Sequence, residues 1–283
     1  MEVGYRKMQR QSSCPNCSIM MFGRKMSFFL TPPCGISAKK HENDLVLVAG
    51  HRNEAEVAEA YGFKNFKLME DYSRENPFLW FVDTKKHLAA LNREGAHPSD
   101  FHPEPVKAIV VFTDPDSWGR DLQIMTDVLR STGVPGEESS EQVVPIYCSN
   151  PDFVWMSEFS VPRFAQGAFT QCLRMLYRQA TGRELEVTQY GKPMPGTYHY
   201  AESLLEKMME NVDGKGVPDA IYAIGDNPAA DVRGANNAGS RWKSVLVRTG
   251  CFMEGENDPV DPADIVLYDF PAAVDLIIKA KKE

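Results

Sequence analysis

The sequence predicts an α/β protein built on a largely parallel sheet. From residue 44 onward, short apolar runs alternate with stretches that have helical periodicity. Such alternation is typical of parallel sheets, because a crossover helix has to connect two parallel strands. The 283 residues, 43% of them apolar and 25% charged, suit one large or two ordinary globular domains.

The composition argues against several classes of protein. A net charge of −8 does not suit a nucleic-acid-binding surface. The longest apolar runs, such as 108–112, are far too short to span a bilayer. Six cysteines are scattered, and only Cys14 and Cys17 form a close pair. A lone Cys-x-x-Cys is a weak zinc or redox signal, and plain reduced thiols in a reducing compartment are the alternative.

The amino-terminal 40 residues differ from the rest of the chain. Residues 1–41 hold seven Lys or Arg residues and one acid, Glu2. Basic, acid-poor and Ser-containing composition fits an organelle transit peptide. The alternative is an irregular terminus on a cytoplasmic protein.

Three strands and three helices are expected between residues 41 and 185. The strands are apolar runs of the kind found in buried parallel strands. The first helix stops at Gly62, and the second carries Leu122, Met125 and Leu129 on one face. Residues 70–107 have only a weak pattern. The expected strands are 45–49, 108–112 and 145–149, and the expected helices are 54–61, 118–129 and 166–180.

The carboxyl-terminal part repeats this alternation. Thr197 is a candidate cap for one helix, and Gly239 is a stop signal for the next. The expected strands are 185–190, 220–224, 244–248 and 265–267, and the expected helices are one after Thr197, 229–238 and 272–281.

Two segments in this part carry candidate chemistry. Lys192 follows one strand, where a lysine can place its charge on a phosphate. Asp226 follows another strand and Asp231 lies in the next helix, so oxygen ligands suited to Mg²⁺ collect at a carboxyl edge. Each has an ordinary reading as a solvated lysine, a turn residue or a first-turn acid. Their order, with 34 residues from Lys192 to Asp226, is much more specific.

With these segments the chain resembles the haloacid dehalogenase-like hydrolases of subfamily IIA, and most of all their cat-eye-syndrome critical-region type. The resemblance covers roughly residues 40–283. Its motifs are Ser149-Asn-Pro-Asp152, Pro162-Arg-Phe-Ala-Gln-Gly-Ala-Phe169, Gly191-Lys-Pro193 and Gly225-Asp-Asn-Pro-Ala-Ala-Asp-Val-Arg-Gly-Ala235.

The resemblance implies a Rossmann-like core with an α/β cap of the C2 type. The cap would comprise residues 41–185, and residues 186–283 would form the carboxyl-terminal half of the core. It also implies a Mg²⁺-dependent phosphohydrolase that uses an aspartate nucleophile. Site roles follow by position: Lys192 would bind phosphate, and Asp226 would bind the metal. Asp231 would support the metal or orient Lys192. Asn227, Asn150 and Asp152 would lie near the substrate.

The chain departs from this family at the nucleophile. The family has an early strand that ends in Asp-x-Asp-Gly, and no such motif occurs in this sequence, nor any aspartate in residues 1–40. We therefore expect an amino-terminally truncated core with an unpaired strand edge, and no catalysis. A non-catalytic pseudo-hydrolase that binds phosphate and metal is the alternative.

One segment imitates the missing motif. Asp114 and Asp116 follow the apolar run 108–112, and Ser149-Asn150 ends the next run. Together with Lys192 and Asp226 these residues would make a small capless phosphatase. Pro115 argues against this reading, because it removes a backbone N–H that would face the phosphate. Asp116 or Ser117 can instead cap the following helix.

The expected partner is a small, anionic phosphorylated metabolite, and assembly into a homodimer stays open. Neither nucleic acid nor a membrane span is expected. Relatives of this type are connected with mitochondria and glycerophospholipid metabolism, which the resemblance implies for this chain.

Overall fold

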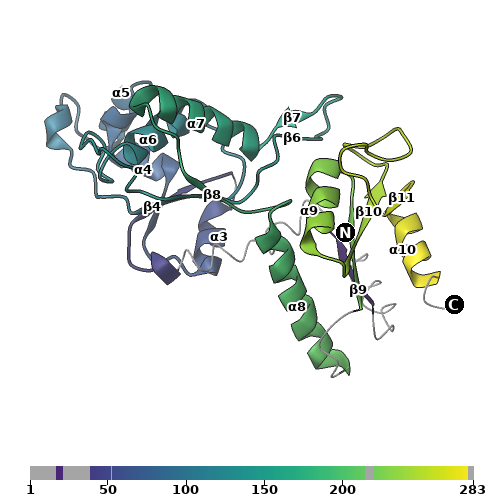
Figure 1. Cartoon of the computed structure of the whole chain (residues 1–283). Helices are drawn as coiled ribbons and strands as arrows, with labels where there is room; N and C mark the ends of the chain where they lie inside the picture. Colours follow the sequence, from purple (N-terminus) through teal and green to yellow (C-terminus); the bar gives the residue numbers. More distant parts are fainter. Residues whose placement is uncertain (1–16, 22–38, 52, 214–218, 280–283) are drawn as a thin grey trace. The chain divides into compact units, whose positions relative to one another are not determined.

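The computed structural model describes residues 17–21, 39–51, 53–213 and 219–279. The chain divides into a central unit, residues 31–191, and a terminal unit, which combines residues 1–30 with 192–283 (Figure 1). The sequence-based boundary was residue 185. Most of the targeting-like segment 1–40, with Cys14, lies outside the described residues.

The central unit is built on a five-stranded parallel sheet. Its strand order is β3-β2-β4-β5-β8, so the chain starts inside the sheet, adds β3 on one side and then continues on the other. This is the flavodoxin-like type of doubly wound order. The strands are β2 Val46–Ala49, β3 Phe66–Leu68, β4 Ala108–Val111, β5 Ile146–Cys148 and β8 Val187–Gln189.

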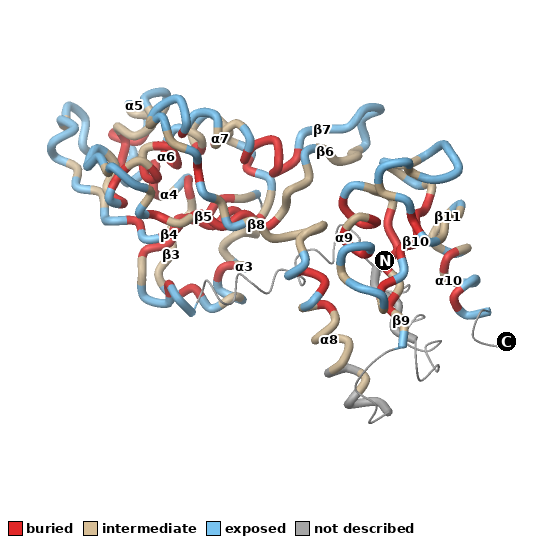
Figure 2. Tube along the Cα trace, viewed as in Figure 1, coloured by how far each residue is buried: buried red, intermediate tan, exposed pale blue. Residues whose placement is uncertain are grey.

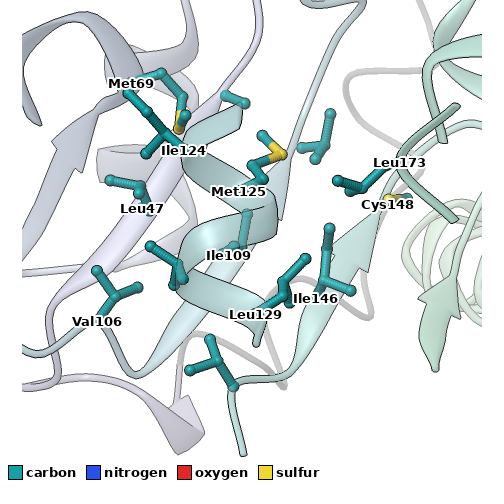
Figure 3. Close-up of a cluster of buried hydrophobic side chains, with 14 of the residues drawn as sticks. Leu47, Met69, Val106, Ile109, Ile124, Met125, Leu129, Ile146, Cys148 and Leu173 are labelled. Carbon is teal, nitrogen blue, oxygen red and sulfur yellow. The ribbon is translucent and has the colours of Figure 1, made fainter. Parts of the chain in front are cut away.

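Helices cover both faces of this sheet, because successive strand residues point to opposite sides. Leu47 and Ile109 face α6 and α7, whereas Val46 and Val48 pack on the side of α3. Figure 3 shows Met125 and Leu129 of α6 lying over the first face. The helices are α3 Glu54–Tyr61, α4 Met69–Glu75, α5 Thr84–Ala90, α6 Trp118–Leu129 and α7 Gln166–Thr181, with 3-10 turns η1 Pro77–Leu79 and η2 Pro98–Asp100.

A small antiparallel hairpin, β6 Val154–Trp155 with β7 Arg163–Phe164, projects from the central unit (Figure 1). Figure 2 shows that it is largely exposed, in contrast to the buried strands of the sheet.

The terminal unit has a four-stranded parallel sheet in the order β1-β9-β10-β11. Its strands are β1 Cys17–Met21, β9 Ala220–Gly225, β10 Trp242–Val247 and β11 Ile265–Leu267. The expectation of an unpaired edge was wrong, because β1 pairs with β9 along residues 17–21 and 220–224. The sequence missed β1 because its short Cys-Ser-Ile-Met-Met run has one β-branched residue and a partner about 200 residues away in sequence.

Helices cover both faces of this sheet as well. Tyr198 and Ala201 of α8 and Ala235 of α9 pack on one face with Trp242, and Ala273 of α10 packs on the other. The bounds are α8 Pro195–Asp213, the π-helical turn η3 Pro228–Val232, α9 Arg233–Ala238 and α10 Phe270–Lys279.

Two helix predictions need correction. Thr197 does not cap α8, because the helix starts at Pro195 and Thr197 lies buried inside its first turn. The expected helix 229–238 is split into η3 and α9, and a π-helical turn of this kind often marks a functional site. Among the described residues, we find no helix with the length and apolar character that crossing a membrane requires.

Candidate functional site

Lys192 lies directly after the end of β8, at the start of the terminal unit. Gly191 precedes it with φ of 90°, a backbone conformation that favours glycine, and a Cβ there would lie 2.4 Å from the Ser149 carbonyl oxygen. The Lys192–Pro193 peptide bond is cis.

The Lys192 ammonium pairs with the Asp231 carboxylate. The Nζ–Oδ1 distance is 2.6 Å, and the side chains are 21% and 2% exposed, respectively. The other Asp231 oxygen accepts a hydrogen bond from the Asn227 backbone N–H at 3.1 Å. Burial raises the pKa of Asp231, and the Lys192 charge and the Asn227 N–H oppose that rise. Both oxygens of Asp231 are thus engaged by groups of the protein.

Local packing places Asp231 under the end of β9. A Cβ on Gly225 would lie 2.2 Å from Asp231 Cγ, so the close approach depends on glycine. The Tyr198 hydroxyl lies 3.1 Å from the Asp231 carbonyl oxygen and 3.3 Å from that of Ala230, and donates to this pair of carbonyls. Asn227 completes the turn, since its side-chain oxygen accepts from the Ala229 N–H at 3.1 Å.

Asp226 directly follows the end of β9 and is only half-buried. Its Oδ2 accepts a hydrogen bond from the Cys251 N–H at 2.8 Å, and its carbonyl oxygen accepts from the Phe252 N–H at 3.0 Å. A Cβ on Gly250 would lie 1.9 Å from Asp226 Oδ2. The segment after β10 therefore packs directly against one side of this carboxylate.

This geometry combines a cation with a carboxylate at one sheet edge. Lys192 offers a positive charge that suits a phosphate, and Asp226 offers oxygen ligands of the kind Mg²⁺ takes from one or two carboxylates. Within the part of the chain that the structure describes, no three His, Cys, Asp or Glu side chains gather closely enough to hold a metal alone. A metal here would share its coordination with water and phosphate oxygens, as Mg²⁺ commonly does.

The two other candidate substrate residues belong to the central unit. The side-chain oxygen of Asn150 accepts from the Asp152 N–H at 3.0 Å, and the Asn150 N–H donates to Gln166 at 2.8 Å. The Asp152 carbonyl oxygen accepts from the Gly167 N–H at 2.8 Å. These contacts form a turn between β5 and the start of α7, so the structure does not bring Asn150 and Asp152 together with Lys192 and Asp226 within one unit.

The imitation motif likewise belongs to a different unit from Asp226. Asp114 and Asp116 follow β4, and β4 and β9 belong to different sheets. The Asp116 carboxylate lies 3.1 Å from His51 Nδ1. Burial acts to raise the pKa of Asp116, but hydrogen bonds from His51 and Ser117 outweigh it and lower the pKa. Asp116 thus interacts within its own unit. The prediction that Ser117 caps α6 was wrong, because Ser117 is the residue at the helix start but its side chain makes no capping hydrogen bond.

Sequence reasoning missed three groups around the site. They are the Tyr198 hydroxyl, the backbone N–H of Cys251 and the closely packed Gly250. One available signal was Thr249-Gly250, which follows a predicted strand and so had to lie at the same sheet edge as Asp226.

The fold is a parallel α/β fold, and a lysine–aspartate pair lies beside a second, half-buried carboxylate, Asp226. These features define a class of candidate phosphate-binding proteins. A family described as HAD-hydrolase-like matches residues 189–273. Two curated relatives share more of the chain. A cardiolipin synthase (CMP-forming)/mitochondrial hydrolase fusion protein of Schizosaccharomyces pombe is 37% identical over 78% of this chain. A mitochondrial hydrolase of Saccharomyces cerevisiae is 32% identical over 75% of it.

The chain belongs to the haloacid dehalogenase-like hydrolases. It spans 37% of the length of the Schizosaccharomyces pombe relative and 66% of the Saccharomyces cerevisiae one. A solved hypothetical protein from Pyrococcus horikoshii OT3 has the same fold, with a TM-score of 0.55 at 18% identity, over 89% of this chain and 74% of that one.

Proposed function

We propose that this polypeptide carries the phosphate- and metal-binding half of a Mg²⁺-dependent phosphohydrolase site of subfamily IIA, cat-eye-syndrome critical-region type. The observation that carries this proposal is the 2.6 Å contact between Lys192 and Asp231 beside the half-buried Asp226. Lys192 would neutralise phosphate charge, and Asp226 would bind the metal.

Asp231 has two candidate roles, as a metal carboxylate and as the residue that orients Lys192. Its engagement by Lys192 and by the Asn227 N–H, together with its burial, favours the orienting role. Asp231 would then not coordinate the metal directly, and only its negative charge would act on the metal. Asn227 shapes the turn and supports Asp231 rather than contacting phosphate through its side-chain oxygen, which already accepts from Ala229.

The donor chemistry at Asp226 fits a Mg²⁺ ion. One carboxylate oxygen is held by the Cys251 N–H, and a carboxylate has further lone pairs for a hard cation. When bound, Mg²⁺ would withdraw charge from the phosphate oxygens. Lys192 would act on the same phosphate as a fixed point charge, and the backbone N–H of Cys251 would keep Asp226 in place.

We further propose that these 283 residues bind a phosphate ester without hydrolysing it. They contain no Asp-x-Asp-Gly, and β1, which pairs with β9, lies in a stretch without acids from residue 3 to residue 41. β1 therefore brings no carboxylate to attack phosphorus. A phosphohydrolase of this mechanism needs such a nucleophile.

The substrate proposal is a small anionic metabolite. Asn150 and Asp152 of the central unit, the proposed cap, stay candidate substrate residues. The names of the two curated relatives support a mitochondrial location, and the fusion with a cardiolipin synthase supports a link to glycerophospholipid metabolism. A homodimer stays a proposal.

Titration of the purified 283-residue polypeptide tests the site. We expect inorganic phosphate to bind only weakly without Mg²⁺ and more tightly with it. We also expect no Mg²⁺-dependent release of p-nitrophenol from p-nitrophenyl phosphate. Asp226→Asn should abolish the Mg²⁺ effect on phosphate binding. Asp219→Asn is the matched control, because it removes an exposed carboxylate near the opposite end of β9.

Two results would contradict these proposals. Phosphate binding that is unchanged by Mg²⁺ in the wild type would remove the metal role of Asp226. Mg²⁺-dependent turnover that disappears in Asp226→Asn would show that the polypeptide is a catalyst. In that case Asp114→Asn would decide whether Asp114 supplies the nucleophile of a capless phosphatase.

A further inference from the structure

Asp226 is held in place by the β10–β11 loop, residues 248–264, rather than by its own strand. The Cys251 N–H donates to Asp226 Oδ2 at 2.8 Å, and the Phe252 N–H donates to the Asp226 carbonyl oxygen at 3.0 Å. The loop contains no helix or strand. A long segment of this kind keeps a fixed shape only where specific contacts tie it down.

One such contact is a bidentate ion pair between Arg233 and Asp261. Arg233 Nε donates to Asp261 Oδ1 at 2.9 Å, and Nη2 donates to Oδ2 at 2.7 Å. The Asp261 side chain is 12% exposed and that of Arg233 is 43% exposed. This parallel arrangement fixes both distance and orientation, which a lysine cannot do.

The part of the loop around Asp261 is itself tightly organised. Asn257 binds both backbone groups of Ala263, accepting from its N–H at 2.9 Å and donating to its carbonyl oxygen at 2.9 Å. Asp258 Oδ1 accepts from the N–H of Asp261 at 2.7 Å. Hydrogen bonds therefore tie the segment 257–263 together with Asp261.

Packing connects this piece to the groups that hold Asp226. Ala263 is buried with Val232 and Leu246, and Phe252 packs against that cluster. Phe252 and its neighbour Cys251 are the two residues that donate to Asp226. A shift of the segment 257–263 would thus displace the Phe252 ring and the two donors.

We propose that Arg233, acting through Asp261, is a positioning residue that sets the orientation of the Asp226 carboxylate. The inference rests on the proposed metal role of Asp226. Arg233 lies two residues after Asp231, so a single turn would orient Lys192 through Asp231 and Asp226 through Arg233. The phosphate side and the metal side of the site are then aligned by one segment.

Arg233→Lys and Asp261→Asn test the proposal in the full 283-residue polypeptide. Mn²⁺ is titrated and its free concentration is followed by electron paramagnetic resonance. Loss of partners that orient a metal ligand typically weakens metal binding about 10- to 100-fold. We expect about tenfold weaker Mn²⁺ binding in both variants, with faster hydrogen exchange of the Cys251 and Phe252 amides.

Arg241→Lys is the matched control. Arg241 is 38% exposed and pairs with Glu202 and Glu206 of α8, so its replacement removes a comparable ion pair that does not involve the loop. It should leave Mn²⁺ binding and the two amides unchanged. Melting temperatures measured in EDTA show whether each variant is folded, and Asp261→Asn, which keeps the shape of the side chain, serves if Arg233→Lys does not fold.

The two readouts separate the inference from the proposed function. Unchanged exchange of the Cys251 and Phe252 amides in both variants would overturn the positioning role, as would faster exchange with wild-type Mn²⁺ affinity. Absence of Mn²⁺ binding in the wild type would instead remove the metal role of Asp226. The amide exchange then decides by itself whether Arg233 positions the Asp226 carboxylate.

Discussion

Lys192 and Asp231 form a 2.6 Å ion pair across 39 residues of sequence, and only the lysine is accessible to solvent. The Lys192 ammonium is partly exposed to solvent, and the buried Asp231 carboxylate holds it in place. Asp231 is itself held by the Asn227 N–H. A phosphate that approaches the strand edge would meet an ammonium group already held in position, so little side-chain entropy would be lost on binding.

Asp231→Asn should weaken both folding and phosphate binding. The substitution leaves the Lys192 charge without its partner while keeping an acceptor for the Asn227 N–H. We expect a loss of about 2 kcal/mol of unfolding free energy, below the range for fully buried pairs because Lys192 keeps contact with water. Urea denaturation measures it. An unfolding free energy equal to that of the wild type would mean that the pair contributes nothing.

Gly225 packs closely against Asp231. A Cβ there would lie 2.2 Å from Asp231 Cγ, and Asp231 is too buried to move aside. We expect Gly225→Ala to cost about 2 kcal/mol or more, as overpacking usually does. Gly196→Ala is the control, because a Cβ at that helical position has nothing within 4 Å. It should be neutral or stabilise by about 0.5 to 1 kcal/mol. Thermal melts of both variants decide, and equal melting temperatures would contradict the packing argument.

The main elements could be predicted because they depend on local patterns. α6 was predicted with the same bounds, since Leu122, Met125 and Leu129 fall on one face, and β2 and β4 are short apolar runs. β1 could not be predicted, because its pairing with β9 is a long-range contact that no pattern in its own sequence indicates. The sequence also did not distinguish the π-helical turn η3 from α9, and one helix was expected over residues 229–238.

The sequence could predict only those parts of the candidate site that are distinctive side chains. Lys192, Asp226 and Asp231 stand out by type and position. The structure pairs Lys192 with Asp231 at 2.6 Å, and the orienting role of Asp231 stays a prediction. The support of Asp226 by the Cys251 N–H was not predictable, since every non-proline residue carries the same donor. The Arg233–Asp261 pair was missed because surface charges at such spacings are common.

Tyr198→Phe probes how the turn beneath Asp231 is supported. It removes only the hydroxyl that donates to the carbonyl oxygens of Ala230 and Asp231, and the aromatic contact with Trp242 remains. We expect a loss of about 1 kcal/mol in unfolding free energy, because buried carbonyls lose a donor. Tyr268→Phe, at a side chain 75% exposed, should change nothing measurable. Equal effects in the two variants would show that the Tyr198 hydroxyl is not a support.

Asp121 should make the stability of the central unit depend on pH. It is 1% exposed in α6, and burial raises its pKa from 3.8 to about 6 despite the opposing charge of Arg120, with Asp116 and Glu54 adding to the rise. Because the folded state then holds the proton more tightly than the unfolded chain, stability is highest below about pH 4 and falls as the pH rises to about 6.

A difference of about 2 pKa units corresponds to about 3 kcal/mol for this residue. Asp121→Asn, which stays uncharged at every pH, should therefore raise the unfolding free energy at pH 7 and flatten its change between pH 4 and 7. Urea denaturation at several pH values measures both slopes. Asp127→Asn, on the same helix, serves as the comparison variant, because burial also raises the pKa of the Asp127 carboxyl. If the wild type and Asp121→Asn lose stability in parallel between pH 4 and 7, another group carries the pH dependence.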